Sequence, residues 1–293
     1  MSGPPRIFDH ALLDVRRRRA LGAPVAGADF LHRAVGNDMA DRLATVTRRF
    51  ATAAEIGSPL PVLAATGQVD RIVRLDRIAE TGPDVVGDAG LLPFAPASLD
   101  LIASILSLHW VNDLPGALAQ MRRALKPDGL FLAAFLGGDT LSELRQAFAT
   151  AEAEITGGAS PRIAPFTDVR TAGALMQRAG FAMPVADQDS HIVRYDSALH
   201  LMRDLRAMGA TNVLYERNRR PLRRAVLTRA IEIYGQRFAD ADGRVRATFN
   251  VISLSGWVPH ESQQQPLRPG SARMRLADAL HSDERPAGEK TGR

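Results

Sequence analysis

The sequence predicts an α/β fold with a doubly wound sheet, and the prediction rests mainly on residues 99–148. An apolar run at 99–108 has the length of a strand that is buried on both faces. An amphipathic segment follows it, and then a second apolar run at 130–136. Because adjacent parallel strands cannot be joined by a tight turn, this strand, helix and strand order indicates a right-handed crossover within a parallel sheet.

Turn and capping residues mark the ends of these elements. In the amphipathic segment, apolar side chains recur at helical spacing: Leu114, Leu118, Met121 and Leu125. The Lys-Pro-Asp-Gly motif at 126–129 then ends the helix, because proline disfavours helical conformation in the residue before it. After the second apolar run, two glycines lead to Asp139, which we expect to cap a helix that begins at Thr140.

Three shorter stretches before this unit are predicted to be strands, each with an acidic residue near its end. They are 53–57 with Glu55, 70–75 with Asp76, and 83–88 with Asp88. The carboxyl ends of parallel strands lie at one edge of the sheet, where ligands bind. A carboxylate there can accept hydrogen bonds from two adjacent ribose hydroxyls. The recurrence predicts a nucleoside site, although any one of these acids could simply be a polar residue that ends a strand.

Residues 107–113 follow the fourth predicted strand and are candidates for the same site. Trp110 either forms a wall of the pocket or packs at its rim under the next helix. His109 is a candidate catalytic base or hydrogen-bond donor, and a structural role for its ring is the alternative. Ser107, Asn112 and Asp113 can cap the following helix, and capping is the preferred role of the last two.

Three strings of this region identify a family. SLSLHWVNDLP, LKPDG and GGDTLSELR resemble the methyltransferase-like family of mitochondrial complex I assembly factors and their bacterial relatives. The string DLRAMGATN at 204–212 and the residues around Trp257 extend this resemblance over about 7–272. A nearer general cousin is the biotin-synthesis methyltransferase that acts on malonyl-carrier protein. The resemblance implies a class I methyltransferase fold, which is Rossmann-like, with an antiparallel last strand and a helical lid insertion.

The resemblance also implies the cofactor S-adenosylmethionine. It places Asp88 at the adenine amino group and the backbone N–H of Ala89 next to it. We also expect Glu55, Gly57, Asp76, Ser107 and Trp110 to bind the cofactor. It further implies a protein substrate, such as a complex I subunit, and the family is associated with arginine hydroxylation rather than methyl transfer.

One departure from the family pattern affects the cofactor prediction. The class carries further glycines after Gly57, whereas this chain continues Ser-Pro-Leu-Pro at 58–61, where two prolines remove N–H donors. One alternative is therefore a non-catalytic assembly scaffold that has lost the cofactor. Another is a carboxyl methyltransferase that acts on a small molecule or a carrier protein.

The chain divides into five predicted regions. They are N-terminal helices at 1–50, the cofactor-binding core at 51–196, the helical lid at 197–240, a final strand at 241–260, and a tail at 261–293 that we expect to be disordered from about 273. Four consecutive arginines at 16–19 suggest either an import presequence or a basic surface helix. Asp9, His10 and Asp14 in the same stretch favour the surface helix.

Composition excludes several classes of function. The chain has no cysteine and no His-Glu-x-x-His motif, so we expect no metal site. No apolar run reaches the roughly 20 residues that span a bilayer. The net charge of +5 comes from arginines scattered among acids, with 5% aromatic residues, which disfavours nucleic-acid binding and leaves a solvated surface or an acidic protein partner.

Composition also suggests a compartment. Lys126 and Lys290 are the only lysines in an alanine- and arginine-rich chain, and we recognise no presequence. A bacterial cytoplasm is therefore expected, and the mitochondrial matrix is the alternative.

Overall fold

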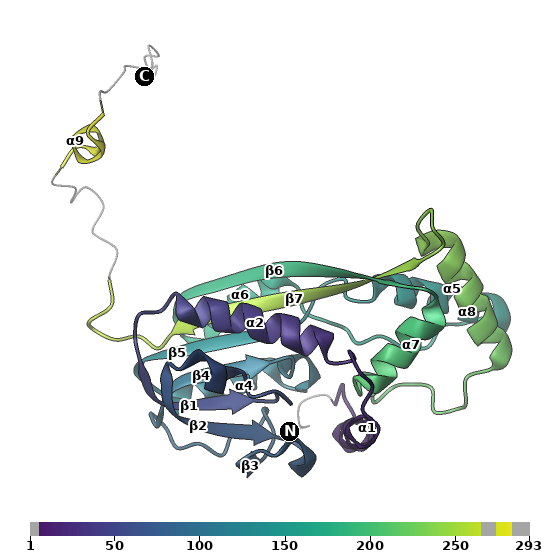
Figure 1. Cartoon of the computed structure of the whole chain (residues 1–293), viewed down its shortest axis with the longest axis horizontal. Coiled ribbons are helices and arrows are strands. Elements are labelled where there is room, and N and C mark those ends of the chain that lie inside the picture. Colours follow the sequence, from purple (N-terminus) through teal and green to yellow (C-terminus); the bar gives the residue numbers. More distant parts are fainter. Residues whose placement is uncertain (1–5, 265–273, 283–293) are drawn as a thin grey trace. The chain divides into compact units, whose positions relative to one another are not determined.

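The computed structural model describes residues 6–264 and 274–282 (Figure 1). It divides into two units, one that reaches His260 and one that starts at Glu261. In the second unit, the short helix α9 (Leu276–Leu280) lies in the tail that the sequence predicts to be disordered. The rest of that predicted disorder falls mostly on residues outside the described ranges.

The first unit is built on a seven-stranded sheet with the order β3-β2-β1-β4-β5-β7-β6. The strands are β1 (Phe50–Ile56), β2 (Val69–Asp76), β3 (Val85–Val86), β4 (Leu99–Ile105), β5 (Leu125–Leu136), β6 (Ala182–Tyr195) and β7 (Val245–Trp257). The first five run parallel, and β7 pairs antiparallel with both β5 and β6. The predicted doubly wound sheet with antiparallel last strands is therefore confirmed.

Helices cover both faces of this sheet (Figure 1). One face packs against α2 (Phe30–Ala44), α3 (Val62–Thr66), α5 (Ser142–Thr156), α7 (Ala198–Ala207) and α8 (Arg224–Phe238). The other packs against α4 (Leu114–Ala124) and α6 (Val169–Ala179). The central strand β4 is buried along its whole length, and its alternating side chains enter both apolar layers. Ala103 contributes to the first layer and Ile102 to the second.

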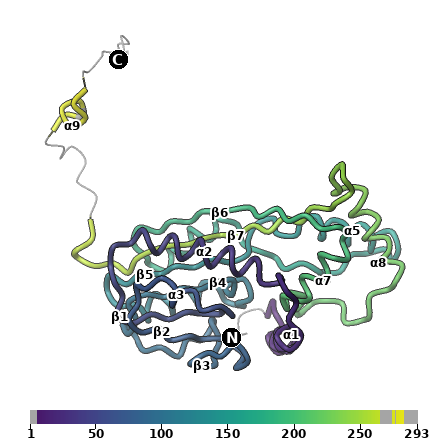
Figure 2. Tube along the Cα trace, viewed as in Figure 1, coloured from purple at the N-terminus to yellow at the C-terminus, as the bar shows by residue number. Residues whose placement is uncertain are grey.

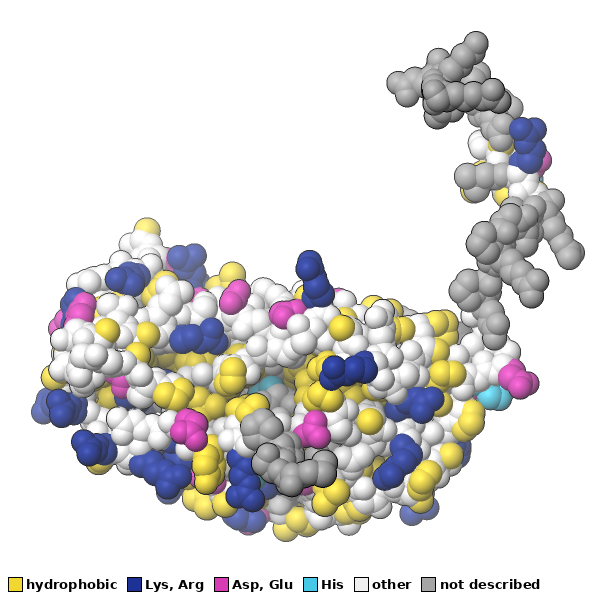
Figure 3. Space-filling view, turned by 180° about the vertical axis from the view of Figure 1, so that it is seen from behind, with side chains coloured by type: hydrophobic (Ala, Val, Ile, Leu, Met, Phe, Trp, Pro, Cys, Tyr) yellow, Lys and Arg dark blue, Asp and Glu magenta, His cyan; other side chains and the backbone are white. Residues whose placement is uncertain are grey.

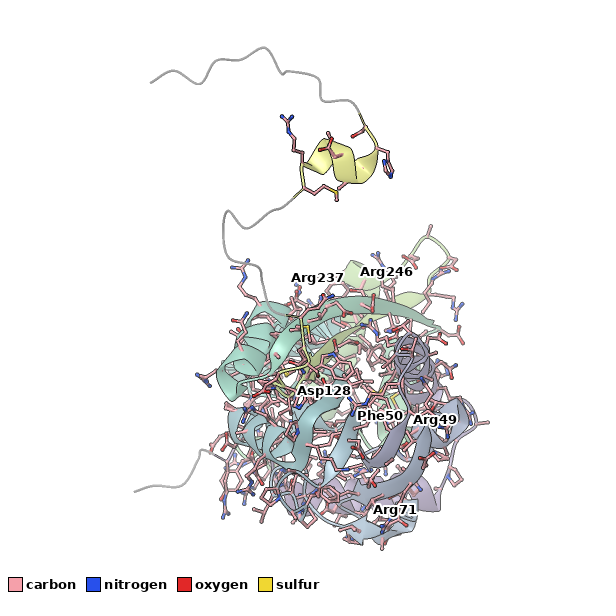
Figure 4. The ribbon with its side chains drawn as sticks, turned by 90° about the vertical axis from the view of Figure 1, so that its left-hand side faces the viewer. Arg49, Phe50, Arg71, Asp128, Arg237 and Arg246 are labelled. Carbon is pink, nitrogen blue, oxygen red and sulfur yellow. The ribbon has the colours of Figure 1, made fainter. Side chains whose placement is uncertain are left out.

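The lid connects β6 to β7 through α7 and α8 (Figure 2). The arrowhead of β1 in Figure 1 marks the carboxyl end of that strand. Helices α1 (His10–Gly22) and α7 lie beyond this end in Figures 1 and 2. These two helices therefore stand at the carboxyl edge of the parallel strands. Figure 4 shows the opposite edge, where Phe50 begins β1 and Asp128 lies at the start of β5.

Several predicted boundaries are wrong. The helix predicted to extend to Phe50 ends at Ala44, because Phe50 pairs with Val69 in the sheet. The Lys-Pro-Asp-Gly motif does end α4, but it does so inside β5, where Asp128 takes a positive φ of 59° and the register with β4 shifts. Within the predicted helical lid at 197–240, the second helix begins only at Arg224.

Asp139 does not cap the next helix, which corrects the prediction. Helix α5 begins at Ser142, and its N-cap position is Leu141 in a left-handed conformation. An additional turn precedes it, in which the buried Thr140 hydroxyl bonds the carbonyl oxygens of Gly137 and Asn250 at 2.7 and 3.0 Å. This tie to β7, which sequence spacing does not reveal, moves the start of the helix two residues onward.

Candidate functional site

A cavity lies at the carboxyl edge of the parallel strands. Its walls come from α1, α2, the ends of β1, β2, β4 and β5, and the lid residues 208–214. Figure 3 shows a hollow in the middle of one face of the molecule, with hydrophobic side chains along its walls and a histidine visible inside it. This is the edge at which sheets of this type bind ligands.

Most of the site residues proposed from the sequence line this cavity. They are Gly57, Asp76, Asp88, Ala89, Ser107, His109 and Trp110. Glu55 does not, because its Oε2 atom accepts a hydrogen bond from the N–H of Leu63 at 2.8 Å and so holds the start of α3. Burial raises the pKa of Glu55, and the Leu63 N–H and the Arg74 charge oppose that rise only in part.

Gly57 lies where β1 approaches the loop after β4. It has a φ of +77°, and a Cβ atom at this position would lie 2.2 Å from the Cβ atom of Ser107. Only glycine fits both the conformation and the space. The Ser107 hydroxyl in turn lies 2.8 Å from the hydroxyl of Ser104, which fixes the opposite wall.

The Ser-Pro-Leu-Pro segment at 58–61 does not line the cavity. Ser58 closes a local turn, because its hydroxyl donates to the carbonyl oxygen of Leu60 at 2.7 Å. The segment leads directly into α3, away from the ligand side of the sheet edge. Its prolines therefore remove no N–H donors from the cavity wall.

Asp76 ends β2, and α1 occupies its carboxylate. The guanidinium of Arg17 donates to both carboxylate oxygens at 2.7 and 2.8 Å, in a bidentate ion pair. The Asp76 side chain is 2% exposed and that of Arg17 is 18% exposed, so the pair is shielded from water. The backbone N–H of Ile78 donates to the same carboxylate at 3.2 Å.

Asp88 follows β3 and is held by a second set of cations. Its Oδ2 atom bonds Arg77 and lies 3.3 Å from Nδ1 of His10, and its Oδ1 atom accepts from Gly90 N–H at 2.8 Å. Burial alone would raise the pKa of Asp88, but these hydrogen bonds and the Arg77 charge lower it well below its usual range. The hydrogen bond to Asp88 raises the pKa of His10, whose Nε2 donates to the carbonyl oxygen of Trp110 at 2.8 Å.

Two histidines in the cavity are neutral at pH 7. Burial lowers the pKa of His109 to about 3 and that of His32 to about 4, and the nearby Arg17 charge contributes to both shifts. The N–H of Leu136 points to Nδ1 of His109 at 3.4 Å. Because Nδ1 accepts, the ring proton lies on Nε2, so His109 presents a hydrogen-bond donor rather than a base.

Trp110 and its neighbours tie the amino-terminal segment to the site. The Trp110 ring lies edge-on to Phe8, with centroids 5.5 Å apart, and 4.7 Å from the ring of His109. Asp113 caps α4 as predicted, by accepting from Gly116 N–H at 2.9 Å. Asn112 does not cap it, since its side-chain oxygen accepts from the backbone N–H groups before α1.

Sequence reasoning missed the residues of α1 that reach the cavity. The arginine run was predicted to be a basic surface helix, yet Arg17 is largely buried against Asp76. A signal was present in the spacing, because His10, Leu13 and Arg17 are three and four residues apart and lie on one face of the helix. All three line the cavity.

Residues 6–264 and 274–282 contain no group of three or more histidine and carboxylate side chains that could hold a metal ion. No helix in them has both the length and the apolar composition that a membrane span requires.

Comparison with known proteins identifies the family. Residues 25–133 match the model of a methyltransferase domain. The arginine-hydroxylase NDUFAF5 of Danio rerio is 39% identical over 263 residues, which cover 85% of this chain and 82% of that protein. The chain belongs to the NDUFAF5 arginine-hydroxylase family. The human NDUFAF5 protein is 38% identical and covers 91% of the chain.

The chain is also similar to methyltransferases that carry a different name. A malonyl-[acyl-carrier protein] O-methyltransferase from Xylella fastidiosa is 41% identical over 175 residues, or 60% of this chain and 57% of that enzyme. Both resemblances proposed from the sequence strings are therefore confirmed. The YcgJ protein of Bacillus subtilis shares the fold, with a TM-score of 0.53 over 78% of this chain and 99% of that one, at 16% identity.

In this NDUFAF5-family chain, replacing Gly57 by alanine should reduce stability more than replacing Gly67. Both glycines have positive φ, but a Cβ atom at Gly57 meets Ser107, whereas one at Gly67 meets nothing within 4 Å. We expect Gly57→Ala to lower the free energy of unfolding by about 1–3 kcal/mol more than Gly67→Ala, in urea titrations followed by circular dichroism. Adding Ser107→Gly should recover part of that loss, and equal losses in the two single variants would refute the contact.

The histidines predict how stability depends on pH. Because the folded state holds the pKa of His109 near 3, the unfolded chain takes up a proton below about pH 6.5 that the folded chain refuses. This part of the stability is present above that pH and is lost as the pH falls. We expect His109→Asn to flatten the decline between pH 6.5 and 4.5, by roughly 1 kcal/mol per pH unit.

His10 provides the matched contrast, because its pKa is raised in the folded state. Its contribution is present below the unfolded pKa and is lost as the pH rises. His10→Asn should therefore leave the decline between pH 6.5 and 4.5 unchanged and remove a loss of stability that occurs as the pH rises above 6.5. Identical slopes in the two variants would show that these rings do not titrate as described.

Proposed function

We propose that this chain binds S-adenosylmethionine in the cavity and acts on a protein substrate in complex I assembly, with an arginine side chain as the modified group. Family membership supports this, because the relatives that span most of the chain are named arginine-hydroxylases. One structural observation carries the cofactor part of the proposal. Asp76 and Asp88, each of which follows a parallel strand, line the same cavity.

The residues present fit the nucleoside part of the cofactor. Asp76 would accept hydrogen bonds from the two ribose hydroxyls, and Asp88 would accept from the adenine amino group. The backbone N–H of Ala89 has no hydrogen-bond partner within the described residues and lies in the cavity wall. Gly57 brings the backbone of β1 close to the ligand side, as a bound methionine group requires.

Binding would be an exchange of partners rather than the filling of free sites. Arg17 and His10 of α1 already bond the two carboxylates, so the ribose and the adenine must displace them or share their acceptors. Because Arg17 and His10 both belong to α1, the exchange would weaken the contacts that hold this helix against the sheet edge. The proline segment at 58–61, by contrast, lies outside the cavity, which supports a cofactor-binding protein over a scaffold that has lost its ligand.

The main chemical task of the chain would be to align the methyl donor with the acceptor. Bound S-adenosylmethionine supplies an electrophilic methyl group, so a methyl transfer needs donor and acceptor held in line more than it needs an acid or base. The cavity provides a neutral Nε2–H donor on His109 and apolar walls that exclude water. We assign His109 the role of orienting the acceptor. The proposed compartment is the bacterial cytoplasm.

Titration calorimetry with S-adenosylmethionine tests the cofactor directly. If Asp88 holds the adenine, Asp88→Ala should weaken binding by about 1–3 kcal/mol, because a charge-assisted hydrogen bond is lost. The control is Asp70→Ala, an exposed carboxylate on β2 outside the cavity, which should leave the affinity unchanged. An undiminished affinity in Asp88→Ala would remove that residue from the site, and no binding by the unmodified chain would favour the scaffold.

Arg17 should oppose cofactor binding. We expect Arg17→Gln to bind S-adenosylmethionine more tightly, by about 1 kcal/mol or roughly fivefold, because the ribose no longer competes with a bidentate ion pair. Arg18→Gln is the control, since its partner Glu80 lies outside the cavity. Weaker binding in Arg17→Gln alone would mean that the guanidinium contacts the cofactor instead of competing with it.

A further inference from the structure

Two neighbouring segments at the edge of the cavity carry arginines with few acidic partners. Residues 16–19 of α1 contain four arginines, and residues 215–224, which lie between α7 and the first residue of α8, contain five. Glu216 is the only carboxylate in the two segments. We call these two segments together the basic rim.

Backbone hydrogen bonds join the segment before α1 to the start of the second part of the basic rim. The N–H of Asp9 donates to the carbonyl oxygen of Val213 at 2.8 Å, and the N–H of Tyr215 donates to that of Ile7 at 2.8 Å. Arg16 donates to the carbonyl oxygen of Asn212, which lines the cavity. The basic rim therefore borders the cavity, and Figure 3 shows Lys and Arg side chains along the margin of the face that contains the hollow.

Most arginines of the basic rim form no ion pair. Three are in ion pairs, Arg17 with Asp76, Arg18 with Glu80, and Arg217 with Asp9. The other six form no ion pair with any described carboxylate: Arg16, Arg19, Arg219, Arg220, Arg223 and Arg224. Burial lowers the pKa of Arg16, and the neighbouring charges of Arg217 and Arg19 lower it further, while the charge of Asp9 opposes the shift.

We propose that the basic rim binds an acidic segment of the protein substrate and holds it beside the cavity. This inference rests on the proposed function, since it supplies the means by which a protein acceptor is brought to the site. Complementary charge accelerates encounter and selects partners. Five guanidinium groups of the basic rim are exposed and form no ion pair, and each can form a bidentate pair with a carboxylate.

The composition of the basic rim favours a protein over the other polyanions. Sites for single-stranded nucleic acid stack bases on aromatic rings, but Tyr215 is the only aromatic residue here and Arg219 already lies over its ring, 5.9 Å from the centroid. Surfaces that bind membranes insert bulky apolar side chains such as tryptophan or phenylalanine. The basic rim has neither of these, and Leu222 is its only large aliphatic residue.

The experiment measures binding of a fluorescein-labelled peptide of twelve glutamates to the full chain by anisotropy, at low and high salt. The rim variant carries Arg219→Glu, Arg220→Glu and Arg223→Glu. The control variant carries Arg71→Glu, Arg123→Glu and Arg170→Glu, which change the net charge equally at exposed arginines of β2, α4 and α6. Arg71 is labelled in Figure 4, which views the edge opposite to the cavity.

We expect the rim variant to weaken peptide binding at least tenfold at low salt and the control variant to weaken it less than threefold, because exposed charges act over about one Debye length. Equal losses in the two variants would overturn the proposal, since net charge alone would then explain binding. Tighter binding of polyuridylate or of phosphatidylglycerol vesicles than of the peptide, lost in the rim variant, would also overturn it and assign the surface to RNA or to membrane.

Failure here can be distinguished from failure of the cofactor proposal. The peptide titrations contain no S-adenosylmethionine, and calorimetry with that ligand is run separately on the rim variant. Retained cofactor affinity together with lost peptide binding supports both proposals. Unchanged peptide binding in a folded rim variant, as judged by circular dichroism, overturns the inference whatever the cofactor does.

Discussion

The site depends on the buried ion pair between Arg17 and Asp76. Taking one partner from a buried pair costs about 3–5 kcal/mol, because the other charge is left without compensation. Here the pair joins α1 to the end of β2, and the contact of His10 with Asp88 joins the same helix to the end of β3. Helix α1 is therefore part of the cavity wall, and the chain itself satisfies the carboxylates that a nucleoside would use.

A second constraint sets the shape of the cavity. The parallel strands end at one edge, and the close approach of Gly57 to Ser107 fixes how near β1 comes to the loop after β4. Apolar side chains fill most of the remaining wall, so charged forms of His32 and His109 are disfavoured there. The result is a chamber whose histidines donate or accept hydrogen bonds without carrying charge. Such a chamber can orient a cofactor and an acceptor while excluding water.

Charge is distributed differently inside and outside the cavity. Inside, each carboxylate meets an arginine or a histidine and little charge remains unbalanced. Outside, six of the nine arginines of the basic rim form no ion pair with a carboxylate of the described residues. The like-charged guanidinium groups of this surface repel one another, and an anionic partner that binds there relieves this repulsion. The separation suits a protein that recognises a macromolecule at its surface and does its chemistry on one side chain in the interior.

The sequence by itself determined the parallel strands and placed Asp76, Asp88 and His109 at or just beyond their carboxyl ends, because apolar runs and turn residues act locally and parallel strands share one edge. The antiparallel end of the sheet was implied by the family resemblance. Only the tertiary structure decided what those residues touch. Glu55 leaves the site to hold the start of α3, and the proline segment that follows it turns away from the cavity. Arg17 and His10 enter the site from α1, far away in the sequence. Such contacts depend on how helices pack across the sheet edge, which no local pattern specifies.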